Sequence, residues 1–166
     1  MKHPSHEREA SPADLQRLAQ YLTNAGLTVA VAESASGGLI AAELTRSPGS
    51  SAWFRGGIVA YDDASKTRIL GIPEATFLEH GSVSRQACAA MAEAARQLFG
   101  ADIGLAETSI AGPGGGTDAK PTGLSYVALA SARAHEVREN YFSGSREQNR
   151  QAAVEVALEL LLEALS

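Results

Sequence analysis

The chain has 166 residues, of which 45% are hydrophobic and 20% charged, with a formal net charge of −5. This length and composition fit one soluble globular domain, and the acidic balance without a basic run argues against a general nucleic-acid binder. Cys88 is the single cysteine, so no disulfide can form within the chain, and a reducing cytoplasm is the expected compartment. No apolar run approaches the roughly 20 residues of a membrane span, and no signal-peptide core is seen at the N-terminus.

The first half of the chain predicts alternating helices and strands. Residues 1–10 are expected to be a disordered tail, and the domain is expected to run from 11 to 166. Ser11 and Pro12 suit the start of a helix that Gly26 ends. The elements expected next are a buried strand over 28–32, a helix over 39–46, a strand over 57–61, short helices after Tyr61 and near 73–79, and an alanine-rich helix that Ser84 caps and that runs to about Phe99.

The second half adds a third strand beginning at 103–106, which leads into a glycine-rich loop. Strands over 123–132 and 136–142 are separated by a short polar connection, which predicts an antiparallel hairpin. Ser145 and Gln148 form a capping-box pattern that opens the final helix. Alternating strands and helices with a late hairpin predict a single three-layer α/β/α domain on a mixed β-sheet.

Two glycine-containing segments are candidate ligand sites. Residues 33–38, Glu-Ser-Ala-Ser-Gly-Gly, lie between a predicted strand and a predicted helix, where backbone N–H groups favour anions. A tight turn with Ser36 as a helix cap explains the same residues equally well. The loop over 112–123 is not a P-loop, because no Gly-Lys-Ser/Thr follows its glycines. It either closes over a small ligand or is a flexible connection, and its Lys120 meets either an anion or solvent.

A third candidate combines three residue types that can activate a nucleophile without histidine. Ser51 lies in a glycine-bounded turn, Tyr61 at the end of a predicted strand and Lys66 at the start of a predicted helix. A serine hydroxyl needs a neighbour to take its proton, and a desolvated lysine amine or a lysine-supported phenol can do so. A turn serine, an edge-strand tyrosine and a surface lysine are the ordinary alternatives. The four histidines show no metal-ligand spacing, so no zinc or iron site is expected.

Taken together and in order, these turns resemble the C-terminal domain of the CinA family, of the nicotinamide-nucleotide amidohydrolase (NMN deamidase) type. The resemblance covers about residues 15–165 and implies a stand-alone form, without the molybdopterin-binding-like domain that many members carry before it. The matching segments are 32–34 with 37–38, 48–54, Tyr61 with Lys66, 80–84, 110–117, 120–123 and 142–146.

The resemblance implies a specific activity. The substrate would be a pyridine nucleotide, nicotinamide mononucleotide, whose carboxamide is hydrolysed to give nicotinic acid mononucleotide and ammonia. Ser51 would be the nucleophile and Tyr61 and Lys66 its activating partners, with no metal or organic cofactor; a homo-oligomer is also implied. The implied substrate-binding residues are Ser34, Ser36, Gly37, Gly38, Ser50, Thr108, Gly112 and either Arg146 or Arg150, between which the sequence does not choose.

Some positions depart from the family pattern. The usual Glu-Ser-Cys-Thr-Gly-Gly has Ala35 and Ser36 here, a glycine is replaced by Ser109, and the aspartate of Gly-Asp-Arg is replaced by Ser145. Ser109 would narrow the pocket or require a changed backbone angle, and Ser145 removes a carboxylate near the expected phosphate site. These changes leave two other functions open: a catalytically degenerate nucleotide-binding module, and an amidase that acts on a different small amide.

Overall fold

The centre of the fold is a five-stranded sheet with the strand order β2-β1-β3-β4-β5. The computed structural model describes residues 12–166, so the expected tail and the Ser11 cap lie outside the described residues. β1 pairs in parallel with β2 and β3, whereas β4 is antiparallel to β3 and β5, which confirms the mixed sheet and its hairpin. The strands are β1 (Val29–Glu33), β2 (Phe54–Val59), β3 (Ile103–Ser109), β4 (Leu124–Ser131) and β5 (His135–Tyr141).

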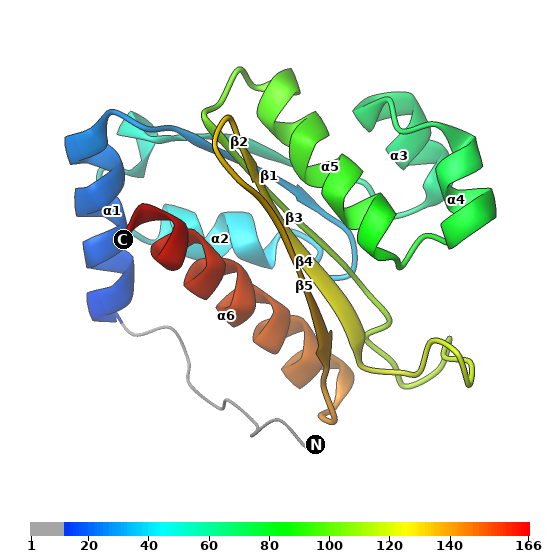
Figure 1. Cartoon of the computed structure of the whole chain (residues 1–166). Coiled ribbons are helices and arrows are strands. Elements are labelled where there is room, and N and C mark those ends of the chain that lie inside the picture. The colour runs from blue at the N-terminus through cyan, green and yellow to red at the C-terminus, as the bar shows by residue number, and fades with distance from the viewer. Residues whose placement is uncertain (1–11) are drawn as a thin grey trace.

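Helices cover both faces of this sheet, so the three predicted layers are confirmed (Figure 1). One face carries α1 (Pro12–Ala25), α2 (Leu39–Thr45) and α6 (Arg146–Leu165). The other carries α3 (Asp63–Leu70), α4 (Glu74–His80) and α5 (Arg85–Leu98), and a short 3₁₀ helix, η1 (Ser50–Ala52), precedes β2. None of the helices described has both the length and the apolar character to cross a membrane.

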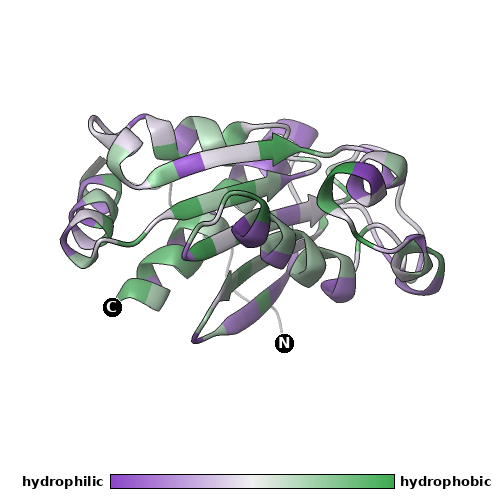
Figure 2. Ribbon diagram, turned by 90° about the horizontal axis from the view of Figure 1, so that it is seen from above, coloured by the Kyte–Doolittle hydropathy of each residue, from purple (hydrophilic) through white to green (hydrophobic). Residues whose placement is uncertain are grey.

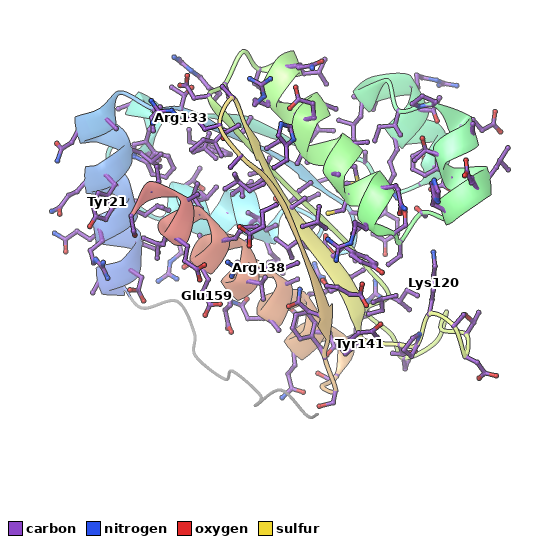
Figure 3. The ribbon with its side chains drawn as sticks, in the orientation of Figure 1. Tyr21, Lys120, Arg133, Arg138, Tyr141 and Glu159 are labelled. Carbon is purple, nitrogen blue, oxygen red and sulfur yellow. The ribbon has the colours of Figure 1, made fainter. Side chains whose placement is uncertain are left out.

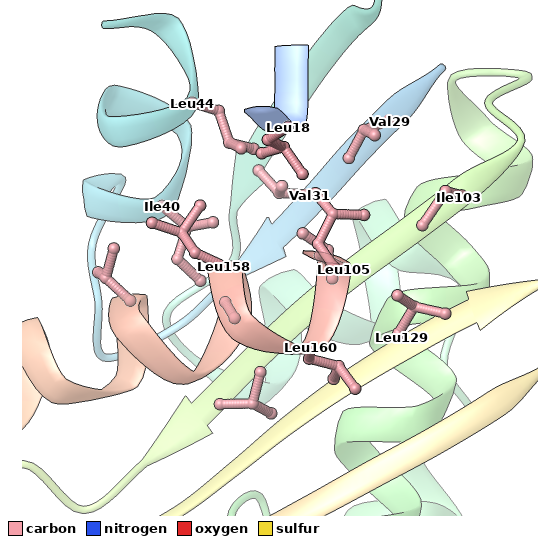
Figure 4. Packing of buried hydrophobic residues seen from close by; sticks show 14 of the residues in the cluster. Leu18, Val29, Val31, Ile40, Leu44, Ile103, Leu105, Leu129, Leu158 and Leu160 are labelled. Atoms are coloured by element: carbon pink, nitrogen blue, oxygen red, sulfur yellow. The ribbon is translucent and has the colours of Figure 1, made fainter. Parts of the chain in front are cut away.

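Successive side chains of each strand point to opposite faces of the sheet and contribute to two separate hydrophobic clusters. Val31 and Leu105 belong to the leucine cluster, which packs against α1, α2 and α6 (Figure 4). Ala32 and Ala106 belong to the alanine cluster, which packs against α3, α4 and α5. The central strands are therefore buried on both faces, as parallel strands between helical layers are. Figure 2 shows hydrophobic residues along the central strands, and helices that carry both hydrophobic and hydrophilic residues.

Several boundaries follow local chemistry that the sequence displays. The Ser145 side chain accepts a hydrogen bond from the Gln148 N–H, and the capping box at the start of α6 is complete. Ser84 accepts from the Ala87 N–H, as predicted for the start of α5. Strand β2 differs from the expected strand over 57–61, because its pairing with β1 begins at Phe54 and ends at Val59. Contacts with a neighbouring strand set these limits, and they override the weak local preference of the Gly-Gly pair.

The order of the strands reverses between β1 and β3. The chain leaves β1 through α2 to reach β2 on one side, and then leaves β2 through α3, α4 and α5 to reach β3 on the other. Such a reversal leaves a crevice outside the carboxyl ends of the two strands, where α/β sheets bind their ligands. The fold thus predicts a ligand-binding site at the carboxyl ends of β1 and β3.

Candidate active site at the carboxyl edge of the sheet

The carboxyl ends of β1, β2 and β3 lie at one edge because these strands run parallel. Ser34 directly follows β1, Tyr61 comes two residues after β2, and Thr108 is the penultimate residue of β3. The Ala60 N–H donates to the Glu33 carbonyl at 2.9 Å, which fixes the end of β2 beside the end of β1. Three residues predicted from separate segments are therefore gathered at this edge.

Ser51 lies at the opposite edge. It is part of η1, before β2, and the adjoining Trp53 carbonyl accepts a hydrogen bond from the Val29 N–H at the beginning of β1. The six residues of β2 extend over roughly 20 Å and separate Ser51 from Tyr61. The predicted convergence of Ser51, Tyr61 and Lys66 is thus not found within the chain, because a full strand lies between residues that are close in sequence. Ser50 belongs to the same short helix and lies at the same edge of the sheet as Ser51.

Lys66 is buried, with 1% of its surface exposed, so the surface-lysine interpretation is wrong. Its Nζ donates to Ser82 Oγ at 2.6 Å and lies 3.6 Å from Asp63 Oδ1. The Phe77 ring centre is 5.9 Å away. Ser82 Oγ in turn donates to Asp63 Oδ1 at 2.5 Å. Sequence reasoning missed both Ser82 and Asp63, although the spacing of Asp63 and Lys66 along one helix was an available signal.

Thr108 and Ser34 lie near the ends of neighbouring strands. Thr108 comes two residues after Ala106 in β3, so strand alternation directs it toward the side of the sheet that carries the alanine cluster, to which Phe77 belongs. Ser34 directly follows β1, two residues after Ala32 of the same cluster. Thr108 Oγ1 donates to the Ser82 carbonyl at 3.1 Å. Ser34 is 6% exposed, and its N–H and carbonyl are fixed by Glu107 Oε2 at 3.2 Å and the Gly37 N–H at 3.1 Å. Ser34 is thus at the end of β1, and the desolvated Lys66 of α3 lies near Phe77 of the cluster to which β1 contributes Ala32.

Two buried carboxylates, Glu33 and Glu107, hold the 33–38 turn from the opposite face. The Ser36 hydroxyl lies 2.6 Å from Glu33 Oε2 and 2.8 Å from Glu107 Oε2. The N-cap of α2 is Gly38, with φ 101°, so Ser36 does not cap the helix. Glu33 accepts the backbone N–H groups of Gly38, Ile40 and Ala41 at 2.9, 3.1 and 2.8 Å, and Glu107 accepts those of Ser34 and Ser36 at 3.2 and 2.9 Å.

Ser109 extends this carboxylate network. Its hydroxyl hydrogen-bonds with Glu107 Oε1 and with Ser125 Oγ, the latter at 2.8 Å. No non-glycine residue among those described has a positive φ, so the glycine-to-serine departure requires no unusual backbone angle. The side chain supports Glu107, and this gives the departure a structural role.

Arg150 braces the same turn. Its Nε donates to the Ala35 carbonyl at 3.0 Å and its Nη2 to the Ser36 carbonyl at 3.1 Å. Its Nη1 lies 2.8 Å from a carboxylate oxygen of Glu147. A side chain on Gly37 would place its Cβ 3.1 Å from Arg150 Nη2, so glycine leaves room for the guanidinium. All three nitrogens of Arg150 thus contact protein groups.

Arg146 has a different setting, on the surface. Its Nη1 donates to the Gly112 carbonyl at 2.8 Å and its Nη2 to the Tyr61 hydroxyl at 2.9 Å. Tyr61 is itself 59% exposed. Arg146 therefore joins the end of β2 to the glycine-rich loop and presents its guanidinium at the rim of the site.

Lys120 attaches the glycine-rich loop to the rest of the fold. Its Nζ donates to the carbonyls of His80 and Val83, at 2.5 and 2.7 Å. Figure 3 shows the side chain rising from the loop toward the helical layer. Its contacts are therefore backbone carbonyls at the end of α4 and in the connection to α5, and neither an anion nor solvent is needed to explain the position of the side chain.

Two other features lie outside this cluster. Within residues 12–166, no three or more His, Cys, Asp or Glu side chains gather in a group that could hold a metal ion. A surface hollow of about 570 Å³, lined by α1 and residues 46–48, contains none of the residues discussed above. The candidate site residues lie at the carboxyl edge of the sheet, and the hollow is not part of that site.

Known proteins are similar to this chain in sequence and in fold. Residues 13–165 match the family described as the CinA C-terminal domain. A "Putative competence-damage inducible protein" of Desulforudis audaxviator is 57% identical over 112 residues, which are 68% of this chain and 27% of that protein. A protein of the same description from Desulforamulus reducens is 48% identical over 145 residues, which are 87% of this chain and 35% of that protein. The chain thus spans about a third or less of the length of these relatives.

Solved structures extend the likeness to the fold. A competence-damaged protein (CinA) superfamily protein from Enterobacter cloacae matches with a TM-score of 0.90 at 30% identity, covering 100% of this chain and 99% of that one. The competence/damage inducible protein CihA from Agrobacterium tumefaciens matches with a TM-score of 0.84 at 39% identity, covering 93% of this chain and 96% of that one. On these matches, the chain belongs to the CinA family as a CinA C-terminal domain.

Proposed function

We propose that this domain is an amidohydrolase that hydrolyses the carboxamide of nicotinamide mononucleotide, with Ser34 as nucleophile and Lys66 as general base. The proposal is supported by the position of Ser34 directly after β1, together with the burial of Lys66 in α3 near Phe77, which belongs to the same cluster as Ala32 of β1. A desolvated lysine beside a serine is a recognised means of activating a hydroxyl. The substrate itself is inferred from the family resemblance.

Ser34 is preferred over two other serines for structural reasons. Ser51 lies beyond the far end of β2 and cannot reach Lys66 within the chain. Ser82 contacts Lys66 Nζ, but its own proton is directed to the Asp63 carboxylate. Ser34 follows the strand at the point where the strand order reverses, which is where an α/β sheet receives its substrate.

The proposed chemistry is acyl transfer in two steps. Neutral Lys66 accepts the proton of Ser34 Oγ, and the oxygen attacks the amide carbon. The carbon–nitrogen bond then breaks, and the leaving nitrogen takes the proton back from Lys66 to depart as ammonia. In the second step Lys66 takes a proton from water, whose oxygen attacks the ester, and returns that proton to Ser34 as the acid leaves. No metal or organic cofactor takes part in this scheme.

Two further features complete the proposal. Arg146, at the rim, would bind the phosphate of the nucleotide, because a guanidinium presents paired donors to phosphate oxygens. We place the enzyme in the cytoplasm, because its single cysteine is a buried free thiol. Nucleic acid and membrane are not among the proposed partners.

The test is ammonia release from nicotinamide mononucleotide by the purified protein and two serine variants. Ser34→Ala is expected to reduce kcat by at least about 10³-fold, because covalent chemistry has no replacement for the hydroxyl. Ser51→Ala makes the same chemical change at the opposite edge of the sheet, and is expected to stay within about twofold of the wild type. Activity that survives in Ser34→Ala but is lost in Ser51→Ala would exclude the assigned nucleophile.

The same assay separates the other two functions. Binding of the nucleotide without ammonia release would indicate a binding module. Ammonia release from a different small amide, but not from this nucleotide, would indicate another amidase. Both results would reject the substrate assignment, and the second would keep the nucleophile open to the same pair of variants.

A further inference from the structure

We infer that Ser82 and Asp63 are positioning residues for Lys66: they hold its buried Nζ in place and favour its charged form, and so influence the pH range in which the site is active. The first part of this inference concerns the lysine alone. The second part, the link to activity, rests on the proposed function. Neither residue was assigned a role from the sequence.

Lys66 is almost completely buried. An ammonium that is 1% exposed has lost almost all of its water and needs replacement partners to remain charged. The described structure supplies a hydroxyl at 2.6 Å, a carboxylate at 3.6 Å and an aromatic ring at 5.9 Å. Of these, only the carboxylate of Asp63 carries a full opposite charge.

The Ser82 hydroxyl takes part in two hydrogen bonds of opposite direction. Ser82 Oγ accepts from Lys66 Nζ and donates to Asp63 Oδ1, so one hydroxyl links the buried cation to a carboxylate that is 50% exposed. A hydroxyl used in this way favours the charged form of both neighbours, because it offers its lone pair to the cation and its proton to the anion. Loss of the hydroxyl or of the carboxylate charge would therefore weaken the ammonium form.

Ser82 is also fixed in place by its surroundings. Its carbonyl accepts from Thr108 Oγ1 at 3.1 Å, which ties it to the end of β3. On either side of it, the carbonyls of His80 and Val83 accept from Lys120 Nζ. The short connection between α4 and α5 is thus fastened to β3 and to the glycine-rich loop, and the Ser82 hydroxyl is held where Lys66 can use it.

Other charged and titratable groups surround Lys66 on several elements. Asp62 caps α3, and its pKa is lowered mainly by hydrogen bonds from Ser65, with the charge of Lys66 a smaller cause. On α5, burial and then the charge of Glu107 raise the pKa of the Cys88 thiol well above its usual value. Lys120 adds a cation beside Gly81 and next to the His80 carbonyl. Among the described groups, Asp63 alone shares the Ser82 hydroxyl with Lys66.

The small number of lysines allows a direct measurement. The chain contains three, Lys2, Lys66 and Lys120, so selective ¹³C labelling of lysine gives three Cε signals. Lys66→Arg and Lys120→Arg variants assign them. The pH titration of the Lys66 Cε shift is then compared between the wild type and Asp63→Asn, in full-length folded protein and without substrate.

Asp63→Asn is expected to move the Lys66 titration midpoint to lower pH by roughly 0.5–1 unit, because the ammonium loses its anionic partner while remaining buried; the half-exposed carboxylate sets this modest size. Ser82→Ala is expected to shift the midpoint in the same direction, and Ser82→Thr, which keeps a hydroxyl, to restore it. Glu74→Gln is the matched control: it removes an exposed carboxylate from α4, and no shift is expected. An unchanged midpoint in both Asp63→Asn and Ser82→Ala would overturn the inference.

A second measurement tests the link to activity. If Lys66 is the general base, the acid limb of the kcat/KM profile for ammonia release is expected to move to lower pH by the same amount as the Lys66 signal. A shifted signal with an unmoved limb would leave the role of Ser82 and Asp63 intact and would reject Lys66 as the base. Failure of the inference and failure of the proposed function are thereby distinguished.

Discussion

Arg146 and Arg150 stand one turn apart on α6, yet their guanidinium groups meet different surroundings. The guanidinium of Arg150 donates hydrogen bonds to the Ala35 and Ser36 carbonyls and pairs with Glu147. Arg146 lies at the rim of the site and donates to the Tyr61 hydroxyl. Sequence alone left the choice between them open, because helical spacing brings both to the same end of the helix. The hydrogen-bond partners separate a brace from a candidate ligand-binding group.

This difference predicts opposite ligand dependence for two alanine variants. Arg146→Ala is expected to weaken binding of nicotinic acid mononucleotide by about 10- to 150-fold, the usual loss for a hydrogen bond to a charged group, and to change binding of the phosphate-free riboside little. Arg150→Ala is expected to affect both ligands equally, because it releases the turn that follows Ser34. Calorimetric titration of each variant with the two ligands measures this. Equal loss for both ligands in Arg146→Ala would count against a phosphate contact.

The same scale shows where sequence reasoning stops. Ser34 and Thr108 were expected among the substrate-binding residues and Lys66 as an activating partner of Ser51; each lies near the carboxyl end of a strand or in the helix that follows one. Ser51 was misplaced, since a motif read along the chain does not show that a full strand runs through it. Ser82 was missed because it is 16 residues from Lys66 in sequence and contacts it only in the folded structure, whereas Asp63 could have been found from its spacing along the same helix.

At the scale of elements, the α6 cap connects stability with the site. Ser145 begins the helix that carries Arg146 and Arg150, and its side chain accepts from the Gln148 N–H. The departure from the family aspartate therefore keeps a side-chain oxygen at the N-cap, where serine and aspartate are nearly equivalent. The helix start agrees with the one predicted from the capping box.

Substitution at this cap predicts a graded loss of stability. Ser145→Ala is expected to lower the free energy of unfolding by about 0.5–2 kcal/mol, because the Gln148 N–H loses its acceptor. Ser145→Asp, which keeps an oxygen acceptor at the N-cap, is expected to stay within about 0.5 kcal/mol of the wild type. Urea unfolding followed by circular dichroism measures both. A destabilised Ser145→Asp with an unaffected Ser145→Ala would reverse the expected order and exclude capping as the role.

At the scale of the whole molecule, one sheet separates two unlike clusters. The leucine cluster lies under α1, α2 and α6, and the alanine cluster lies under α3, α4 and α5. The sequence predicted the layers from the alternation of strands and helices, but composition alone could not assign each helix to a face. The site lies where the layers meet at the carboxyl edge, so its Lys66 and its Glu33 belong to opposite faces of the sheet.

Each cluster contains a natural probe, which makes the cooperativity of folding measurable. Trp53, the single tryptophan, is 1% exposed in the leucine cluster, and Cys88, the single cysteine, is fully buried in the alanine cluster. Burial also raises the pKa of the Cys88 thiol, so its reaction with a thiol reagent is expected to be slow until the chain opens. In a urea titration, Trp53 fluorescence and Cys88 labelling are expected to change over the same range, as one cooperative unit requires. Labelling of Cys88 at urea concentrations where the Trp53 signal is still native would instead show that the α3–α5 layer, which includes the helix that carries Lys66, unfolds before the rest of the domain.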